Sequence, residues 1–302
     1  MKLTRLAKEP ILKPLDHHRW EKGAVFNPGA VFHNGSFHLI YRATDMGPHE
    51  RFGPYTNSLG YAVSMDLVNW ERSDNPILEP RAPQEARGPE DPRIVELDGL
   101  FYMVYCGFGG RFDGDYRLSM ATSEDLVHWE RRGVMLDEEN KNGALFPERI
   151  DGRYCLLHRR HPDIWLCFSD DLKTWEHHRK IMSPQPGTWN HKKIGIAGPP
   201  IKLEGRWLLL FHGVDSQWTY RLGAALLDYE DPGRVVARQA EPILEPELEW
   251  ERNGFVPQVV FSCGTVRKDD RIYCFYGGAD TVIGVACVDS QEVTFDDESW
   301  LV

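Results

Sequence analysis

The sequence lacks an apolar run long enough to span a bilayer, and its N-terminus has no apolar stretch of the kind found in signal peptides. It also lacks any long run of like charge, although the formal net charge is −11. A net negative charge without a cluster of basic residues argues against nucleic-acid binding, which requires a positively charged surface. We therefore expect a cytoplasmic protein with neither a membrane nor a nucleic acid as partner.

The six cysteines form no Cys-x-x-Cys pair, and they all lie in apolar, strand-like segments. This placement predicts reduced, mostly buried thiols and no zinc site. No glycine-rich nucleotide pattern is present, so a nucleotide is not the expected carrier of any phosphate. The cysteines are Cys106, Cys155, Cys167, Cys263, Cys274 and Cys287.

Helical patterns are also scarce, whereas one β-hairpin pattern recurs five times. Each copy has two apolar strands around a tight polar turn, at residues 29–45, 92–108, 144–160, 198–215 and 262–280. Asn-Gly and Asp-Gly are strong hairpin signals, because both central residues of a type I′ turn need positive φ. The turns are Asn34-Gly35, Asp98-Gly99, Asp151-Gly152, Glu204-Gly205 and Asp269-Asp270.

A third strand follows each hairpin, and three copies end in a Ser-x-Asp-Leu-x-x-Trp-like motif at Trp70, Trp129 and Trp175. The hairpin turns are 53 to 65 residues apart, a period typical of propeller blades. We therefore predict an all-β fold, a single five-bladed β-propeller over residues 24–302. A sandwich with irregular loops fits five matched copies poorly. Residues 1–23 are expected to form an N-terminal arm that could contact another subunit.

Aromatic residues make up 12% of the chain and include ten Trp. Flat aromatic faces can stack on sugar rings, although most of these side chains are expected to pack in the core.

Charged groups gather at the predicted strand ends, which a propeller brings to the mouth of its central channel. Asp91, beside Glu90, is the best candidate for a general acid, because a neighbouring carboxylate or burial can raise its pKa. Arg149, Lys193 and His212 come from three different blades and could surround one phosphate, with Arg159 or Arg160 nearby. Individually, such residues could equally form salt bridges between blades or cap turns.

Several longer segments, in order along nearly the whole chain, resemble glycoside hydrolase family 130, the family of β-mannoside phosphorylases. They include VFNPGA (25–30), GPEDPRI (88–94), LFPERIDGRYCLLHRR (145–160), LLLFHGVD (208–215) and YGGADTVIGVA (276–286). The resemblance implies a five-bladed propeller and an inverting phosphorolysis. Inorganic phosphate would be the co-substrate, and the products would be α-mannose 1-phosphate and a shortened sugar. No cofactor or metal is expected.

The resemblance also implies roles for individual residues. Asp91 matches the proton donor, whose proton is expected to pass through the 3-hydroxyl of the bound mannose. The expected sugar-binding residues are Asn27, Arg42, Asp45, Glu90, Tyr220 and Asp280. The expected phosphate-binding residues are Arg149, Arg159, Arg160, Lys193 and His212. Which of the two adjacent arginines, Arg159 or Arg160, faces the phosphate stays open.

Three questions remain open from the sequence. The linkage could be β-1,4 or β-1,2, and the acceptor sugar would depend on loops 46–57, 109–116 and 185–192. A hydrolase on the same fold would need a carboxylate base, for which Glu148 or Asp215 could serve, and a non-catalytic glycan-binding propeller is a second alternative. A homo-oligomer is a further expectation. Residues that could line the acceptor site are His49, Arg51, Tyr55, Phe112 and Trp189.

Overall fold

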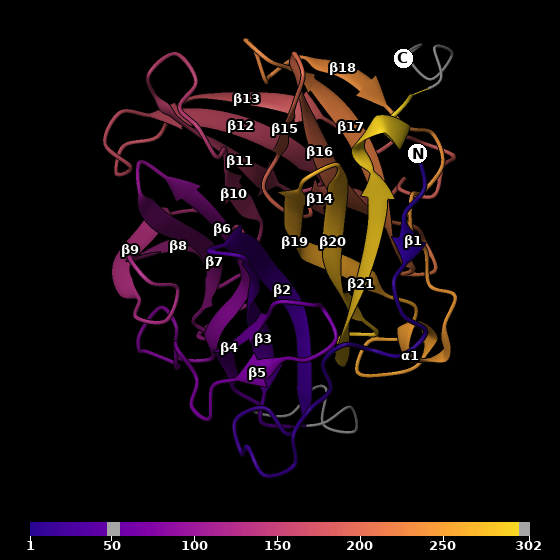
Figure 1. Ribbon diagram of the computed structural model, residues 1–302. Coiled ribbons are helices and arrows are strands. Elements are labelled where there is room, and N and C mark those ends of the chain that lie inside the picture. The colour runs from indigo at the N-terminus through magenta and orange to yellow at the C-terminus, as the bar shows by residue number, and fades with distance from the viewer. Residues whose placement is uncertain (47–54, 296–302) are drawn as a thin grey trace.

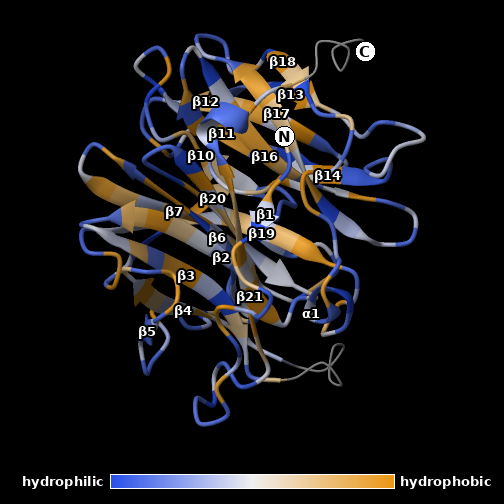
Figure 2. Ribbon diagram, turned by 45° about the vertical axis from the view of Figure 1, so that its right-hand side comes forward, coloured by the Kyte–Doolittle hydropathy of each residue, from blue (hydrophilic) through white to orange (hydrophobic). Residues whose placement is uncertain are grey.

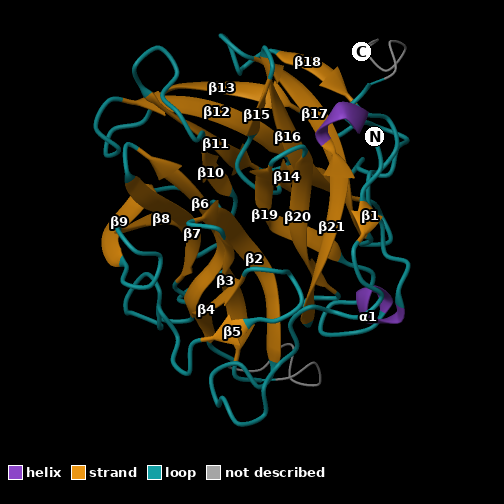
Figure 3. Cartoon of the chain, viewed as in Figure 1, coloured by secondary structure: helices purple, strands orange, loops and turns teal. Residues whose placement is uncertain are grey.

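The computed structural model describes residues 1–46 and 55–295, which consist almost wholly of strands (Figure 1, Figure 3). Five small antiparallel sheets form a ring, so the predicted five-bladed β-propeller is confirmed. None of the helices in this part of the chain has the length and apolar content needed to cross a bilayer.

Each blade is a sheet whose first-named strand is the innermost. Blade 1 contains β2 (Ala24–His33), β3 (Ser36–Thr44), β4 (Asn57–Ser64) and β5 (Glu71–Arg72). Blade 2 contains β6 (Gly88–Leu97), β7 (Leu100–Phe108), β8 (Tyr116–Ser123) and β9 (Glu130–Leu136). Blade 3 contains β10 (Gly143–Leu145), β11 (Tyr154–Arg160), β12 (Asp163–Ser169) and β13 (Glu176–Met182).

The last two blades complete the ring. Blade 4 contains β14 (Lys193–Ile196), β16 (Arg206–Val214), β17 (Tyr220–Asp228) and β18 (Val235–Arg238), with β15 (Ile201–Leu203) also paired to β16. Blade 5 contains β19 (Val260–Lys268), β20 (Arg271–Gly278), β21 (Val282–Asp289) and β1 (Thr4–Arg5). The short helix α1 (Glu249–Arg252) and the 3₁₀ turn η2 (Ser290–Glu292) lie outside the sheets.

The hydrophobic core lies between the blades. Five large buried clusters each join two neighbouring blades, and many strands, such as β7, β16 and β21, are mostly apolar runs between polar loops (Figure 2). All six cysteines are free and buried, as the sequence predicted. Because no blade can bury both of its faces alone, the ring depends on every neighbour.

The predicted hairpin turns join the first two strands of blades 1, 2, 3 and 5, and β15 to β16 in blade 4. In the Asn34-Gly35 turn the two φ angles are 46° and 80°, as a type I′ turn requires. The turn chemistry of the sequence therefore located the hairpins correctly.

Part of the N-terminal segment, predicted as an arm over residues 1–23, pairs with the last blade of the propeller. Strand β1 pairs with β21 and becomes the outermost strand of blade 5, while Leu3 joins the buried core. The first strand of the chain thus closes the ring against the last blade. The predicted contact with another subunit stays a prediction.

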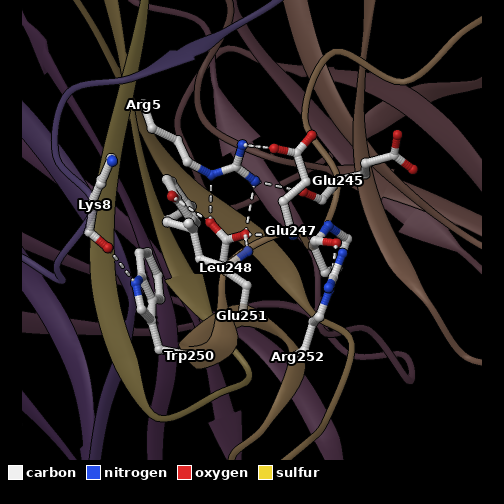
Figure 4. A network of polar contacts seen from close by, with 10 residues as sticks. Arg5, Lys8, Glu245, Glu247, Leu248, Trp250, Glu251 and Arg252 are labelled. Atoms are coloured by element: carbon white, nitrogen blue, oxygen red, sulfur yellow. Dashed lines mark hydrogen bonds and ion pairs between the residues drawn. The ribbon is translucent and has the colours of Figure 1, made fainter.

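A buried carboxylate fixes this closure (Figure 4). Arg5 Nε lies 2.8 Å from Glu251 Oε1, and Arg5 Nη1 lies 2.9 Å from Glu247 Oε2. Glu251 has no solvent exposure and also accepts a hydrogen bond of 2.8 Å from the Tyr276 hydroxyl. The Trp250 indole donates to the Lys8 carbonyl at 2.9 Å, which ties the same segments together.

Replacing Arg5 with Ala is expected to lower the free energy of unfolding by about 3–5 kcal/mol, because it leaves Glu251 buried without its counter-ion. A shift of the urea midpoint with an unchanged denaturant slope would measure this loss. Lys8→Ala is the matched control: it keeps the carbonyl that Trp250 uses, so its effect should stay within about 0.5 kcal/mol. An equally small effect of Arg5→Ala would contradict a closing role for this ion pair.

Candidate active site

One end of the central channel holds a cavity of about 560 Å³, a size suited to a small sugar. Residues from all five blades line it, which is the convergence that the sequence predicted. The charged and polar lining residues are Asn27, Arg42, Asp91, Lys141, Asn142, Arg159, Lys193, His212, Gln217, Gln258 and Asp280. Trp218, Tyr220, Val256, Pro257, Val259 and Phe261 complete the wall.

Two β-bulges aim the side chains of Asn27 and Asp91 into this cavity. The pairing register shifts between Phe26 and Gly29 in β2, and between Glu90 and Arg93 in β6. Asn27 and Asp91 take φ angles of 48° and 53°, a left-handed conformation that is uncommon for residues other than glycine. Strained backbone of this kind concentrates at functional sites, where the surrounding structure holds it in place.

Asp91 lies at the centre of a polar network. Asn27 Nδ2 donates to Asp91 Oδ1 at 2.9 Å, and Arg42 Nη1 lies 3.3 Å from the same oxygen. Burial alone would raise the pKa of Asp91. The positive charges of Arg42, Lys141 and Arg93 outweigh burial and lower the pKa. The carboxyl is therefore ionised in the unliganded protein at neutral pH.

Glu90 and Lys141 form the layer behind Asp91. Glu90 is 1% exposed and does not line the cavity, but Arg42 Nη2 donates to it at 2.8 Å and Lys141 Nζ lies 3.0 Å away. Lys141 itself lines the cavity, although no pattern in the sequence pointed to it. It lies in the link between blades 2 and 3, where no strand pattern or motif marks it.

Arg93 ties opposite sides of the channel together. Its guanidinium donates to the carbonyls of Ala197 and Ile196 in blade 4, at 2.6 Å and 2.8 Å, and to the Asp91 carbonyl at 3.0 Å. The side chain is 1% exposed. Arg93 therefore holds the strained Asp91 backbone against the far side of the ring.

Arg159, Lys193 and His212 also line the cavity, and the arginine and the lysine bring positive charge to it. Burial and the neighbouring charges of Arg159 and Lys141 lower the pKa of Lys193 to about 8. Burial likewise lowers the pKa of His212 well below its ordinary value, so its ring is neutral at neutral pH. The group therefore contains one permanent cation, one cation near its titration point and one neutral ring, an arrangement suited to an incoming anion.

The lowered pKa of Lys193 predicts an alkaline limit for anion binding. Above about pH 8 the ammonium loses its proton, so kcat/KM for an anionic co-substrate should fall as pH rises. The check is kcat/KM measured over about pH 6 to pH 10 for the protein and for Lys193→Arg. The arginine stays charged, so the variant should show no decline near pH 8. A decline shared by both proteins would assign the limit to another group.

Besides Glu90, three of the predicted site residues do not line the cavity. Arg149 lies in the β10–β11 hairpin at the opposite end of the blade, where it bonds to the Tyr154 hydroxyl at 2.6 Å and to Asp98 at 3.1 Å. Its assignment to the phosphate site was wrong, because it follows the inner strand rather than preceding it. Arg160 pairs with Glu138 at 3.0 Å, whereas Arg159 lines the cavity.

Asp45 also does not line the cavity; its carboxylate accepts a hydrogen bond of 2.8 Å from the Thr56 backbone N–H. Glu148 and Asp215, the two candidate bases, are equally absent from the lining. Glu148 pairs with Lys202 at 2.7 Å, and Asp215 pairs with Arg221 at 2.7 Å. Among the described residues the carboxylates that line the cavity are Asp91 and Asp280.

Of the residues predicted for the acceptor side, His49 and Arg51 lie outside the described residues. Tyr55, Phe112 and Trp189 do not line the cavity; Trp189 instead packs against Phe211 and donates to a backbone carbonyl. Trp218, which was not predicted, is an aromatic residue that does line the cavity. Its side chain is 52% exposed, and its φ is 60°. No motif marked it, because it lies in a loop between two strands of blade 4.

Comparison with known proteins adds an independent line of observation. A family model described as beta-1,4-mannooligosaccharide phosphorylase matches residues 8–295. A 1,2-beta-oligomannan phosphorylase of Thermoanaerobacter sp. (strain X514) is 57% identical over 98% of this chain and 100% of its own length. A beta-1,2-mannobiose phosphorylase of the same strain is 54% identical, with coverage of 97% and 99%.

The fold has a solved counterpart. The structure of the beta-1,2-mannobiose phosphorylase from Listeria innocua, in complex with beta-1,2-mannobiose, superposes with a TM-score of 0.87 at 27% identity. The match covers 97% of this chain and 98% of the Listeria chain.

Proposed function

The chain belongs to glycoside hydrolase family 130, and we propose that it catalyses the phosphorolysis of β-mannosides at the channel cavity. The observation that carries this proposal is the composition of that cavity. One strained, hydrogen-bonded carboxyl, Asp91, shares the same space with Arg159, Lys193 and His212. Such a site offers a proton-transfer group for the sugar and a binding wall for an anion.

The proposed reaction exchanges a glycosidic bond for a phosphate ester. A phosphate oxygen attacks the anomeric carbon from the face opposite the leaving oxygen, so a β-mannoside gives α-mannose 1-phosphate. The bond from the anomeric carbon to the leaving oxygen breaks, and that oxygen takes up a proton. With the monohydrogen phosphate dianion as nucleophile, the proton balance closes without an external acid.

Asp91 is proposed to deliver that proton, directly or through the mannose 3-hydroxyl. Because Asp91 is ionised in the unliganded site, it must acquire a proton in the complex. Bound phosphate brings negative charge beside Arg159 and Lys193 and so offsets the positive field that lowers the pKa of Asp91. Asn27 Oδ1 and Asn142 Oδ1, which accept no hydrogen bond from the described protein groups, are available to sugar hydroxyls.

The site supports phosphorolysis over hydrolysis for a physical reason. Hydrolysis with inversion needs a carboxylate base to activate water, whereas phosphate already carries its charge. The two residues considered as bases, Glu148 and Asp215, are engaged in ion pairs outside the cavity. The relatives named as phosphorylases of β-1,2-linked mannosides favour the β-1,2 linkage for this chain as well.

Incubation of the purified protein with β-1,2- or β-1,4-mannobiose, with and without inorganic phosphate, tests the proposal. We expect α-mannose 1-phosphate only when phosphate is present, and faster from the β-1,2-linked sugar. Free mannose released equally without phosphate would establish a hydrolase instead. Faster turnover of the β-1,4-linked sugar would overturn the linkage while leaving phosphorolysis in place.

A further inference from the structure

Each blade has one set of three side chains at corresponding positions, in addition to the cavity residues, and in most blades all three are polar. One member precedes the inner strand, one lies in the second strand immediately before a channel-side residue, and one lies in the outermost strand. In blade 1 the set is Glu21, Tyr41 and Arg72; in blade 2 it is Glu85, Tyr105 and Arg131; in blade 5 it is Glu251, Tyr276 and Arg5. These three sets share one chemistry, a buried carboxylate held by a tyrosine hydroxyl and a guanidinium.

Blade 4 has only the arginine of this arrangement, and blade 3 has none of its three residue types. In blade 4, Arg238 Nη2 donates to Asn190 Oδ1 at 2.9 Å, and Phe211 replaces the tyrosine. In blade 3 the corresponding residues are Asn140, His158 and His178. The outer strand β13 therefore has no ion pair of the type that ties the outer strands of blades 1, 2 and 5 to their neighbours.

A cysteine completes the blade 3 set. Cys167 lies in β12, between the strands that carry His158 and His178, and its Sγ and one nitrogen of each ring all lie within 4.8 Å of one another. The register places Cys167 where the other four blades have alanine, at Ala62, Ala121, Ala225 and Ala286. Blade 3 thus exchanges a carboxylate, a phenol, a guanidinium and a methyl group for an amide, two imidazoles and a thiol.

Two imidazoles and one thiol are the ligand set that Zn²⁺ and similar borderline metals prefer, and three protein ligands leave a fourth position for water. His158 and Cys167 are buried, whereas His178 is half-buried and gives access from solvent. We propose that His158, Cys167 and His178 form a binding site for a divalent transition metal of the Zn²⁺ class, which ties β13 to β11 in place of an ion pair.

The protonation states fit this assignment. Burial lowers the pKa of His158 to about 3, and burial also lowers the pKa of His178, so both rings are neutral as metal ligands must be. Burial raises the pKa of the Cys167 thiol, so its proton would be released to solvent when the metal–sulfur bond forms.

The groups around the two histidines are also compatible with a metal site. His158 Nε2 and His178 Nδ1 face each other at 3.1 Å, and a metal between them requires the proton on His158 to move to Nδ1. The Asn140 amide lies 3.2 Å from that nitrogen and can turn its oxygen toward it to accept the proton, whereas the Glu138 carboxylate lies 3.6 Å away, outside hydrogen-bond distance. Proteins commonly orient a metal-bound histidine through a hydrogen bond from its other ring nitrogen to a polar group.

The alternative without a metal is a chain of hydrogen bonds. Asn140 Nδ2 would donate to His158 Nδ1, His158 Nε2 to His178 Nδ1, and His178 Nε2 to the Trp175 carbonyl at 3.2 Å. This chain satisfies both rings and assigns no role to the Cys167 thiol. The two interpretations therefore differ in whether the sulfur participates.

Titration of the chelator-treated full chain with Co²⁺ separates them. A metal site predicts one equivalent of Co²⁺ with a thiolate-to-cobalt charge-transfer band and the visible bands of tetrahedral cobalt, both displaced by Zn²⁺. Cys167→Ala should abolish the charge-transfer band, and His178→Gln should weaken binding at least about tenfold. Cys155→Ala is the matched control, because that buried thiol lies in β11 but packs toward blade 4.

Two outcomes would overturn the proposal: no thiolate band in the folded protein, or a band that survives Cys167→Ala. Circular dichroism of each variant separates loss of the site from loss of the fold. A melting temperature that Zn²⁺ raises in the protein and in Cys155→Ala, but not in Cys167→Ala, would support the proposed clamping role. None of these readouts depends on catalytic activity.

Discussion

Replacing Asp91 with Asn is expected to lower kcat for phosphorolysis of a mannobiose by about 10²–10⁴-fold, the usual contribution of a positioned proton donor. Asn has nearly the same shape, and its oxygen can still accept from Asn27 Nδ2, which now lies 2.9 Å from Asp91 Oδ1. The amide cannot deliver a proton to the leaving oxygen. Steady-state kinetics with coupled detection of mannose 1-phosphate would measure the loss.

The nature of the leaving group makes this test specific. An aryl β-mannoside with an acidic phenol as leaving group needs little protonation, so Asp91→Asn should slow it far less than mannobiose. Glu148→Gln is the matched carboxylate-to-amide control, because Glu148 pairs with Lys202 outside the cavity and should leave kcat nearly unchanged. Equal losses for both substrates would assign Asp91 to binding or folding instead of proton transfer.

Arg159→Ala is expected to raise KM for phosphate by about 100-fold, because it removes charge-assisted hydrogen bonds from a buried anion site. Arg159 lines the cavity, and its charge contributes to the lowered pKa values of Lys193 and His212. Affinity for the sugar should change much less. Initial rates over a range of phosphate concentrations, at a fixed saturating concentration of mannobiose, would give the value.

Arg149→Ala is the natural companion to this variant. The sequence placed both arginines at the phosphate site, but the structure puts Arg149 at the far end of blade 3 beside Tyr154 and Asp98. KM for phosphate should therefore stay within about twofold of the parent value. A large increase for Arg149→Ala, or none for Arg159→Ala, would contradict the arrangement of the cavity described above.

The fold was predictable because its signals are local. Each hairpin turn, such as Asn34-Gly35 or Asp98-Gly99, can be recognised from two adjacent residues that tolerate positive φ. The number of such hairpins then fixes the number of blades. The role of residues 1–23 was not predictable in this way, because the pairing of β1 with β21 joins segments from opposite ends of the chain.

The site was predictable only where a residue directly adjoins a recognisable strand. Asp91, Arg42 and His212 adjoin or lie within strands of the repeated hairpins, and all three line the cavity. Arg149 was expected at the start of the inner strand of blade 3, but it follows that strand, β10, and so lies at the other end of the blade. Lys141 and Trp218 lie in connections between strands, where spacing carries no information about direction.

The correspondence among the blades was also hidden from the sequence. Tyr41, Tyr105 and Tyr276 have their partners far away along the chain, and only the folded ring brings the three members of each set together. The cluster of His158, Cys167 and His178 has no metal-binding spacing, since its members come from three successive strands. Side chains that meet across a sheet leave no fixed interval in the sequence.

The closing strand β1 has a consequence for how the protein is made. Translation produces β1 first, yet its partner β21 emerges only after four blades have been synthesised. During that interval β1 has no strand to pair with, and bringing the two ends together carries the loop-closure entropy of almost the whole chain. Closure is therefore expected to be the last folding step on or after the ribosome. Until it occurs, the outer edge of blade 5 stays unpaired and open to association with other nascent chains.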